Sequence, residues 1–258
     1  MTLRNRILGS VFLLTTTISL SSAAADVEEG FTSMFNGKDL TGWEGLPGAW
    51  GVVDGAITAE STPEKPCKAA HYLMWRGGKP GDFELRTEFR LQGPGANSGI
   101  QFRSRELPNW DTSGYQADME NSDRWFGCLF EHTRGGIAMR GEKVVIDKEG
   151  KKTVSPIPVP GKVQKLIAGD GTPGGNLSLS AALLRQVKIG EWNSYAIIAW
   201  GPDITLKIND VVMCQVTDQQ AGVAAKDGVI ALQMHPGPPM KVQFKNIRIK
   251  SLDAKSSN

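Results

Sequence analysis

The segment from Gly114 to Glu120 combines acid and amide side chains at a spacing that suits chemistry on a β-strand. Successive strand residues point to opposite faces of a sheet, so Gln116, Asp118 and Glu120 would share one face. The outer face of an antiparallel sheet is also polar, but we expect such a face to favour Lys, Glu and Thr. Amide and carboxylate groups suit hydrogen bonding to a sugar or the transfer of protons. We therefore favour a functional face here.

The heptapeptide that begins at Asn97 shows the same alternation. As a strand it would place Asn97, Gln101 and Arg103 on one face and apolar residues on the other. Two neighbouring strands of this kind would form one polar wall, and we expect these side chains to bind substrate hydroxyls.

A third candidate is the stretch from Ile230 to Lys241, in which Gln233 and His235 would share a strand face. Prolines follow at positions 236, 238 and 239 and restrict the backbone just after His235. A rigid backbone suits a histidine that must be held in position for catalysis. A histidine that only caps the strand end through a backbone hydrogen bond explains the pattern equally well.

Glu131 ends an apolar run and precedes a glycine-rich loop that begins at His132. Loops at strand ends often carry functional residues, although periodicity alone would make Glu131 an ordinary exposed acid. The aromatic side chains of His71, Trp75 and Trp125 could stack on a sugar ring, with a half-buried packing role as the alternative for each.

The first 25 residues have the pattern of a secretory signal. Arg4 and Arg6 precede an apolar stretch, and three alanines at positions 23 to 25 form a cleavage site. The apolar stretch has about 14 residues, fewer than the ~20 that span a bilayer. We expect cleavage near Asp26, export to the periplasm or the medium, and no transmembrane segment in the mature chain.

The mature chain would carry a balanced charge. Removal of Arg4 and Arg6 leaves 27 basic residues against 27 acidic ones. A neutral chain lacks the basic footprint of nucleic-acid binding. Residues 26–258 are enough for one all-β domain with its own core.

The three cysteines permit at most one intramolecular disulfide. Cys128 and Cys214 lie in apolar strand-like contexts, so we expect them to be buried small hydrophobic residues rather than a bridge. No spacing of Cys, His or acidic residues identifies a zinc site.

Short β-like runs separated by glycine and proline fill the chain from Phe31 onward, which indicates an all-β sandwich or barrel. The predicted strands are Trp50–Ile57, His71–Trp75, Phe83–Leu91, Ser98–Ser104, Tyr115–Met119, Cys128–Glu131, Lys143–Ile146, Tyr195–Trp200, Ile204–Ile208, Val211–Thr217, Gly228–Met234 and Val242–Lys250. Asn209-Asp210 predicts a tight hairpin between two of them. Residues 147–175 read as a long surface excursion, and Leu177–Val187 as a short helix.

Several of these segments together resemble the secreted bacterial family of 3-keto-disaccharide hydrolase domains, formerly domain of unknown function 1080. The matching segments are Phe31–Trp43, Trp50–Ala56, Asn97–Arg103, Gly114–Glu120, Glu191–Tyr195 and Gly228–Lys250. The resemblance implies a concanavalin-A-like jelly roll of two curved antiparallel sheets with a sugar-binding concave face.

The resemblance also implies action on glycosides that are already oxidised at C3. A ketone at C3 makes the C2 proton acidic, so a base can remove it. The C1 substituent can then leave as an alcohol, and water can add across the double bond. A bound divalent ion could polarise the ketone, but the sequence shows no ligand spacing that identifies a metal site.

Retaining glucanases of the same fold resemble one another in a Glu-x-Asp-x-Glu strand, whereas this chain has Gln116 in the first position. A glutamine cannot act as a carboxylate nucleophile, which disfavours the retaining mechanism and favours elimination. We predict Asp118, Glu131 and His235 as the acid and base residues, without assigning the one that takes the C2 proton. The predicted substrate-binding residues are Asn97, Gln101, Arg103, Gln116, Glu120, Gln233 and Lys241.

A non-catalytic carbohydrate-binding module of the cell envelope is the alternative prediction, and an envelope interaction domain a third. The carbohydrate is the expected partner in the first two readings. Convergence of the predicted residues within about one sugar's width would favour those two readings.

Overall fold

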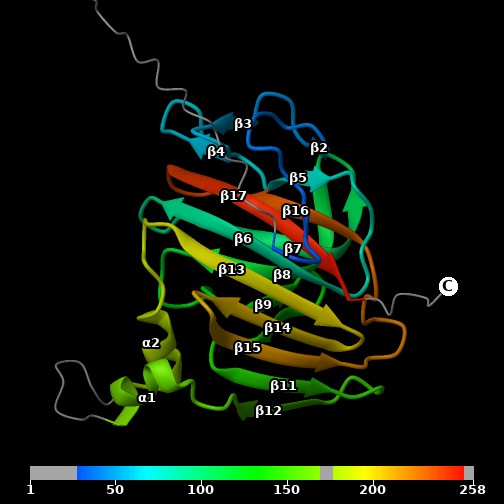
Figure 1. Ribbon diagram of the computed structural model, residues 1–258, viewed down its shortest axis with the longest axis vertical. Coiled ribbons are helices and arrows are strands. Elements are labelled where there is room, and N and C mark those ends of the chain that lie inside the picture. Colours follow the sequence, from blue (N-terminus) through cyan, green and yellow to red (C-terminus); the bar gives the residue numbers. More distant parts are fainter. Residues whose placement is uncertain (1–27, 169–176, 253–258) are drawn as a thin grey trace, which may run out of the picture.

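The computed structural model describes residues 28–168 and 177–252, and the predicted signal at residues 1–25 lies outside these ranges. The described chain folds into two packed β-sheets with two short helices at one end (Figure 1). The jelly-roll sandwich implied by the family resemblance is confirmed.

The first sheet has ten strands and runs across the front of the molecule in Figure 1. Their order in space is β12 (Lys152–Pro156), β11 (Glu142–Ile146), β15 (Val211–Asp218), β14 (Asp203–Ile208), β13 (Asn193–Trp200), β6 (Phe83–Gln92), β17 (Met240–Ser251), β4 (Ala56–Ser61) and β3 (Trp50–Val53), with β1 (Thr32–Ser33) also paired to β17. The pairing of β11 with β15 is parallel, whereas the neighbouring pairs are antiparallel.

The second sheet has seven strands and lies behind the first in Figure 1. Their order is β10 (Gly135–Ala138), β9 (Leu129–Glu131), β8 (Asp111–Glu120), β7 (Asn97–Leu107), β16 (Val229–Met234), β5 (His71–Trp75) and β2 (Trp43–Glu44). The two polar segments found in the sequence are therefore adjacent strands, β7 and β8.

The core fills the space between the two sheets. β6 alternates buried and half-buried residues along its whole length, so one of its faces belongs to the core. Phe83 of β6 meets Phe102 of β7 with ring centroids 6.1 Å apart, which joins the sheets. Tyr115, Ala117 and Met119 of β8 are also buried in this core, so the opposite face of β8 is left for the polar residues.

Residues at positive φ form two of the turns between strands. Asn209 and Asp210 have φ values of 51° and 64°, so the predicted hairpin between β14 and β15 is confirmed. The single strand predicted over Trp50–Ile57 is wrong, because Asp54 and Gly55 also adopt positive φ and turn the chain between β3 and β4.

The segment at residues 147–175 has more regular structure than predicted. It contains β12, which pairs with β11, and the helix α1 (Gly161–Ala168), while residues 169–175 lie outside the described ranges. The predicted helix over Leu177–Val187 is shorter, spanning α2 (Leu179–Leu184). It starts there because the Ser178 side chain accepts a hydrogen bond from the Ala181 amide.

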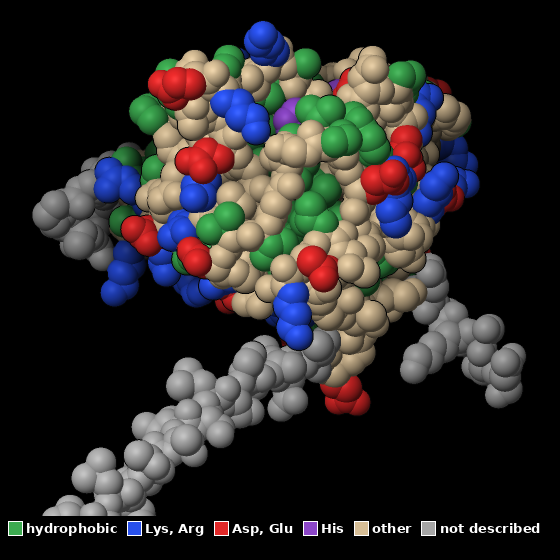
Figure 2. Space-filling view, turned by 90° about the horizontal axis from the view of Figure 1, so that it is seen from above, with side chains coloured by type: hydrophobic (Ala, Val, Ile, Leu, Met, Phe, Trp, Pro, Cys, Tyr) green, Lys and Arg blue, Asp and Glu red, His purple; other side chains and the backbone are tan. Residues whose placement is uncertain are grey.

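The mixed charge of the surface and the state of the cysteines agree with the expectations from the sequence. Figure 2 shows hydrophobic side chains along the middle of one face, with acidic and basic side chains mixed around its margin. All three cysteines are free, and Cys128 and Cys214 are buried as predicted. Neither helix of the described chain has the length and apolar character needed to cross a membrane.

Candidate active site

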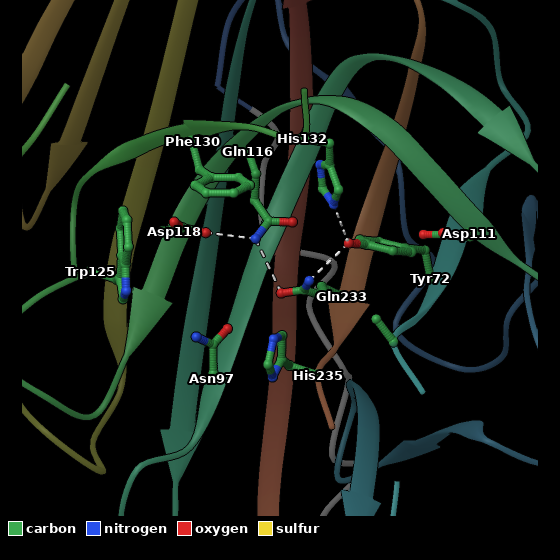
Figure 3. Close-up of a pocket in the computed structure, with 11 residues that line it drawn as sticks. Tyr72, Asn97, Asp111, Gln116, Asp118, Trp125, Phe130, His132, Gln233 and His235 are labelled. Carbon is green, nitrogen blue, oxygen red and sulfur yellow. Dashed lines mark hydrogen bonds between the residues drawn. The ribbon is translucent and has the colours of Figure 1, made fainter. Parts of the chain in front are cut away.

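The outer face of the seven-stranded sheet holds a pocket of about 400 Å³ (Figure 3). Its polar lining residues are Tyr72, Asn97, Asp111, Gln116, Asp118, His132, Gln233 and His235. Trp125 and Phe130 form an aromatic side wall, with ring centroids 5.7 Å apart and the planes nearly perpendicular. The pocket thus combines an apolar wall with several polar groups, as ligand sites commonly do.

Strand register brings the polar residues together. Gln101 of β7 lies opposite Gln116 of β8, and Asn97 lies opposite Glu120. Gln233 of β16 lies opposite Tyr72 of β5 in the same way. Residues that face each other across neighbouring strands project to the same face, so the polar wall predicted from alternation exists in the structure.

Asp118 is the buried carboxylate of this pocket, with 5% of its surface exposed. Its Oδ1 atom accepts a hydrogen bond of 2.6 Å from Nε2 of Gln116. Burial raises the pKa of Asp118 to about 7; the Gln116 hydrogen bond opposes this shift and the charge of Glu120 adds to it. A carboxylate that titrates near neutral pH is suited to taking and returning a proton.

Gly99 of β7 makes room for the Gln116 side chain. Gly99 lies opposite Asp118 in the register. A Cβ atom at position 99 would come within 2.6 Å of Gln116 side-chain atoms. The glycine is therefore required by packing and lets the Gln116 amide reach Asp118.

Five side chains form a closed ring of hydrogen bonds at the pocket floor, which we call the amide ring: Gln101, Gln116, Gln233, Tyr72 and His132. Gln101 Nε2 donates to Gln116 Oε1 at 2.9 Å, and Gln116 Nε2 donates to Gln233 Oε1 at 3.2 Å. Gln233 Nε2 donates to the Tyr72 hydroxyl at 2.8 Å. His132 closes the ring with contacts of 3.2 Å to Tyr72 and 3.0 Å to Gln101.

His235 follows β16 directly, forms a hydrogen bond to the backbone and lines the pocket, and its catalytic role stays a prediction. Its Nδ1 atom lies 2.6 Å from the carbonyl oxygen of Pro236. A carbonyl oxygen only accepts hydrogen bonds, so Nδ1 carries the hydrogen and the neutral ring keeps a lone pair on Nε2. That lone pair can accept a proton or a substrate hydroxyl.

Arg103 does not lie in this pocket, contrary to the prediction. The register of β7 shifts after Phe102, and Arg103 takes a φ of 46°, which turns its side chain away from the polar face. Its guanidinium donates to the carbonyls of Gly81 and Gly201 and to the carboxylate of Asp82, all at 2.8–2.9 Å. Arg103 is a buried structural cross-link.

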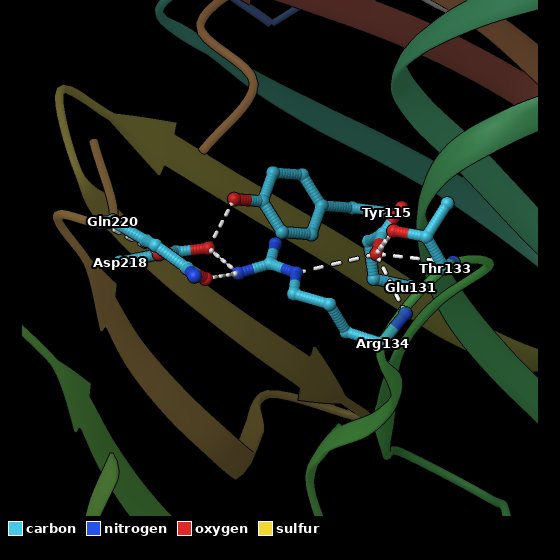
Figure 4. A network of polar contacts seen from close by, with 6 residues as sticks. All are labelled: Tyr115, Glu131, Thr133, Arg134, Asp218 and Gln220. Carbon is cyan, nitrogen blue, oxygen red and sulfur yellow. Dashed lines mark hydrogen bonds and ion pairs between the residues drawn. The ribbon is translucent and has the colours of Figure 1, made fainter. Parts of the chain in front are cut away.

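Glu131 is also placed elsewhere. It lies opposite Tyr115, a core residue of β8, and therefore points away from the face that carries Gln116. Its carboxylate accepts hydrogen bonds from Thr133 and from Arg134, which also pairs with Asp218 (Figure 4). Glu131 therefore belongs to a structural network and not to the pocket.

The remaining predicted residues lie beneath the cavity or outside it. Gln101 is fully buried beneath the cavity and reaches it only through Gln116 and His132. Glu120 shares the polar face but does not line the cavity. Lys241 lies on β17 of the other sheet, 3.8 Å from Glu60, which contradicts its predicted role. The described residues contain no group of three or more His, Cys, Asp or Glu side chains arranged to hold a metal.

Comparison with known proteins identifies the family to which this fold belongs. Residues 30–250 match the model of the 3-keto-alpha-glucoside-1,2-lyase-like domain. The chain belongs to this family. The resemblance drawn from its short motifs is thereby confirmed. Membership places this lyase-like domain among carbohydrate-active proteins.

Solved structures similar to the lyase-like domain share its fold. One is a proposed glycosyl hydrolase from Parabacteroides distasonis, 18% identical with a TM-score of 0.51, where the match covers 86% of this chain and 99% of the other. Another is the carbohydrate-binding module CBM66 from Bacillus subtilis, 13% identical with a TM-score of 0.50, covering 83% and 98%. No curated protein matches the sequence.

Five pocket residues were not predicted from the sequence: Ala70, Tyr72, Asp111, Phe130 and His132. The strand that carries Tyr72 reads His-Tyr-Leu-Met-Trp, so no alternation of polar and apolar residues marked its outward residue. His132 lies just past the end of β9, where the alternation of side chains along a strand no longer applies. Its position directly after Glu131 was the available signal.

Proposed function

We propose that this lyase-like domain cleaves glycosides that carry a ketone at C3, by elimination followed by hydration. The observation that carries the proposal is Asp118, a buried carboxylate with a pKa of about 7 on the pocket floor. Family membership supports the substrate class. The amide at position 116, where a glucanase would have its nucleophile, supports elimination over double displacement.

Asp118 and His235 supply the two proton transfers. Asp118 removes the C2 proton, whose electron pair forms the C1–C2 double bond while the C1–O bond breaks. His235, protonated at Nε2, gives its proton to the departing oxygen and so releases an alcohol. The Pro236 carbonyl accepts from Nδ1 and so fixes the orientation of the ring.

Hydration reverses these roles and restores both residues. Neutral His235 takes a proton from the water molecule that adds at C1, and Asp118 returns its proton to C2. The net reaction is hydrolysis of the glycoside to a 3-keto sugar and an alcohol. The side-chain amides of Gln116 and Gln233 are positioned to bind the hydroxyls or the enolate oxygen.

The test is product analysis with a 4-nitrophenyl 3-keto-glucoside and the matched glucoside without the ketone. We expect release of nitrophenol only from the ketone, because only the ketone acidifies C2. In D₂O the 3-keto sugar should carry deuterium at C2 wherever the proton held by Asp118 exchanges with solvent before hydration. Cleavage of both substrates alike, or of neither, would refute the proposed reaction.

A carbohydrate-binding module is the second candidate, favoured by the fold shared with CBM66 and by the aromatic wall. In that case oxidised and ordinary glycans would bind saturably and remain intact. The same assay therefore separates the two functions.

Substitution of Trp125 tests the aromatic wall. Trp125 lines the pocket, and the guanidinium carbon of Arg124 lies 4.6 Å from the centroid of the Trp125 ring. We expect Trp125→Ala to raise KM, or Kd for a bound sugar, about fivefold, because a lost aromatic contact is worth roughly 1 kcal/mol. Trp200→Ala, at an exposed tryptophan on β13 outside the pocket, is the control and should leave KM unchanged. An equal effect of both variants would contradict the assignment.

A further inference from the structure

The hydrogen bonds of the amide ring have a definite direction. Gln116 donates from Nε2 to both Asp118 and Gln233, so its oxygen is left to accept from Gln101. Gln101 then donates twice, to Gln116 and to His132. Ser104 supports this orientation by donating from its hydroxyl to Gln101 Oε1 at 2.5 Å. Each amide in the ring is thus fixed by its neighbour.

The direction of these bonds defines the state of His132. Its Nδ1 atom faces a donor, the Gln101 amide, and must therefore accept. In the neutral ring the hydrogen is then on Nε2 and is donated to the Tyr72 hydroxyl. Both nitrogens of His132 are occupied, whereas His235 keeps a free Nε2. His132 is therefore suited to act through other residues rather than on the substrate.

We propose that His132 is a positioning residue, which holds Gln101 and Tyr72 so that the Gln116 amide keeps its N–H group on the Asp118 carboxylate. The role deepens the proposed function, since it concerns the base of that reaction. His132 is the exposed member of the ring, and it covers Gln101 and Tyr72, which are both fully buried.

The physical reason is the cost of a misdirected amide beside Asp118. If the Gln116 amide turned over, its oxygen would face the carboxylate at the 2.6 Å now spanned by a hydrogen bond. Such a contact is repulsive unless the carboxyl group is protonated. The present direction lowers the pKa of Asp118 against the burial that raises it, and so preserves an ionised base. Without His132, Gln101 loses an acceptor and the ring loses its closure.

A pair of substitutions separates this role from simple packing. His132→Leu removes both the acceptor and the donor. His132→Gln restores them, because a glutamine oxygen can accept from Gln101 while its Nε2 donates to Tyr72. Gln233→Met removes a member of the amide ring that lies on β16. This variant replaces His132→Leu in the test if the leucine variant folds poorly.

The readout is the titration of Asp118 by carbon-13 NMR of labelled aspartate in the protein without substrate, with Asp118→Asn to assign the signal. We expect a midpoint near 7 in the wild type and about one unit higher in His132→Leu and Gln233→Met, with His132→Gln equal to wild type. His71→Leu is the control, because His71 lies outside the pocket and contacts Trp50. The midpoint of Asp118 in this variant should match that in the wild type.

The pH profile gives a second readout. A raised Asp118 pKa lowers kcat/KM of His132→Leu about tenfold at pH 6, and the loss disappears at high pH, which a packing defect would not do. An unchanged midpoint in His132→Leu, or a glutamine variant as impaired as the leucine variant, would overturn the proposal. Because the NMR titration uses no substrate, it decides this point even if the protein cleaves no 3-keto-glycoside.

Discussion

Asp118→Asn is expected to lower kcat/KM for a 3-keto-glucoside by about a thousandfold. The asparagine cannot accept the C2 proton, and general base catalysis contributes roughly 10²–10⁴ in rate. The amide matches the carboxylate in size, so the fold should survive, which circular dichroism and thermal unfolding would check. Residual turnover within tenfold of wild type would show that another group is the base.

Glu131→Gln is the matched control for this substitution. Glu131 is the other carboxylate that the sequence nominated, but it lies in the Arg134 network and outside the pocket. Its kcat/KM should remain within about threefold of wild type. A loss comparable with that of Asp118→Asn would restore Glu131 to the catalytic set.

The wild-type pH profile follows from the same carboxylate. Because the base must be ionised, kcat/KM should rise with pH and show a limb with its midpoint near 7, the pKa of Asp118 in the free protein. The ordinary midpoint of an exposed aspartate is about 4. A limb at that lower value would contradict the burial of the base.

Arg134→Met is expected to lower the free energy of unfolding by about 3 kcal/mol, as expected when a buried charge loses its partner. Arg134 lies 2.8 Å from Asp218, whose side chain is only 1% exposed (Figure 4). Tyr115 donates to the same carboxylate oxygen, but a phenol cannot neutralise its charge. Urea denaturation followed by tryptophan fluorescence would measure the loss.

A second substitution and a surface control test the cause. Asp218→Asn, added to Arg134→Met, removes the unpaired charge and should recover part of the lost stability. Arg76→Met breaks exposed ion pairs with Glu44 and Glu106 and should cost less than about 1 kcal/mol. If Arg76→Met costs as much as Arg134→Met, burial is not the source of the effect.

The part of the site that could be predicted from sequence is the part governed by strand alternation. Gln116 and Asp118 were placed on one face because their strand is regular, and β16 added Gln233 for the same reason. These residues do line the pocket. Alternation contains no information on pairing, so only the structure shows that the two polar strands, β7 and β8, are neighbours.

The failures arose where regularity ends. Arg103 follows a register shift in β7, and a single residue at positive φ reverses the side of the sheet to which a side chain points. Glu131 was placed by its position at a strand end, whereas its partner Tyr115 shows that it belongs to the core side. Lys241 ends the same sequence segment as His235, but the strand that carries it, β17, belongs to the opposite sheet.

Tyr72 and His132 could not be predicted because their role depends on hydrogen bonds between strands distant in sequence. Tyr72 is separated from its partner Gln233 by 161 positions. A tyrosine within an apolar strand gives the same pattern as a core residue. Only the three-dimensional pairing of β5 with β16 shows that its hydroxyl joins a polar network.

Gly99 offers a way to reshape the pocket without replacing its ionisable groups. It occupies the interior of a strand, where glycine is normally unfavourable, and the space it leaves is filled by the Gln116 side chain. A single methyl group at position 99 would displace that amide while every ionisable group remained in place. For protein engineers, position 99 therefore offers a way to raise the pKa of Asp118 without replacing any polar residue of the pocket, because the displaced amide is the group that lowers that pKa.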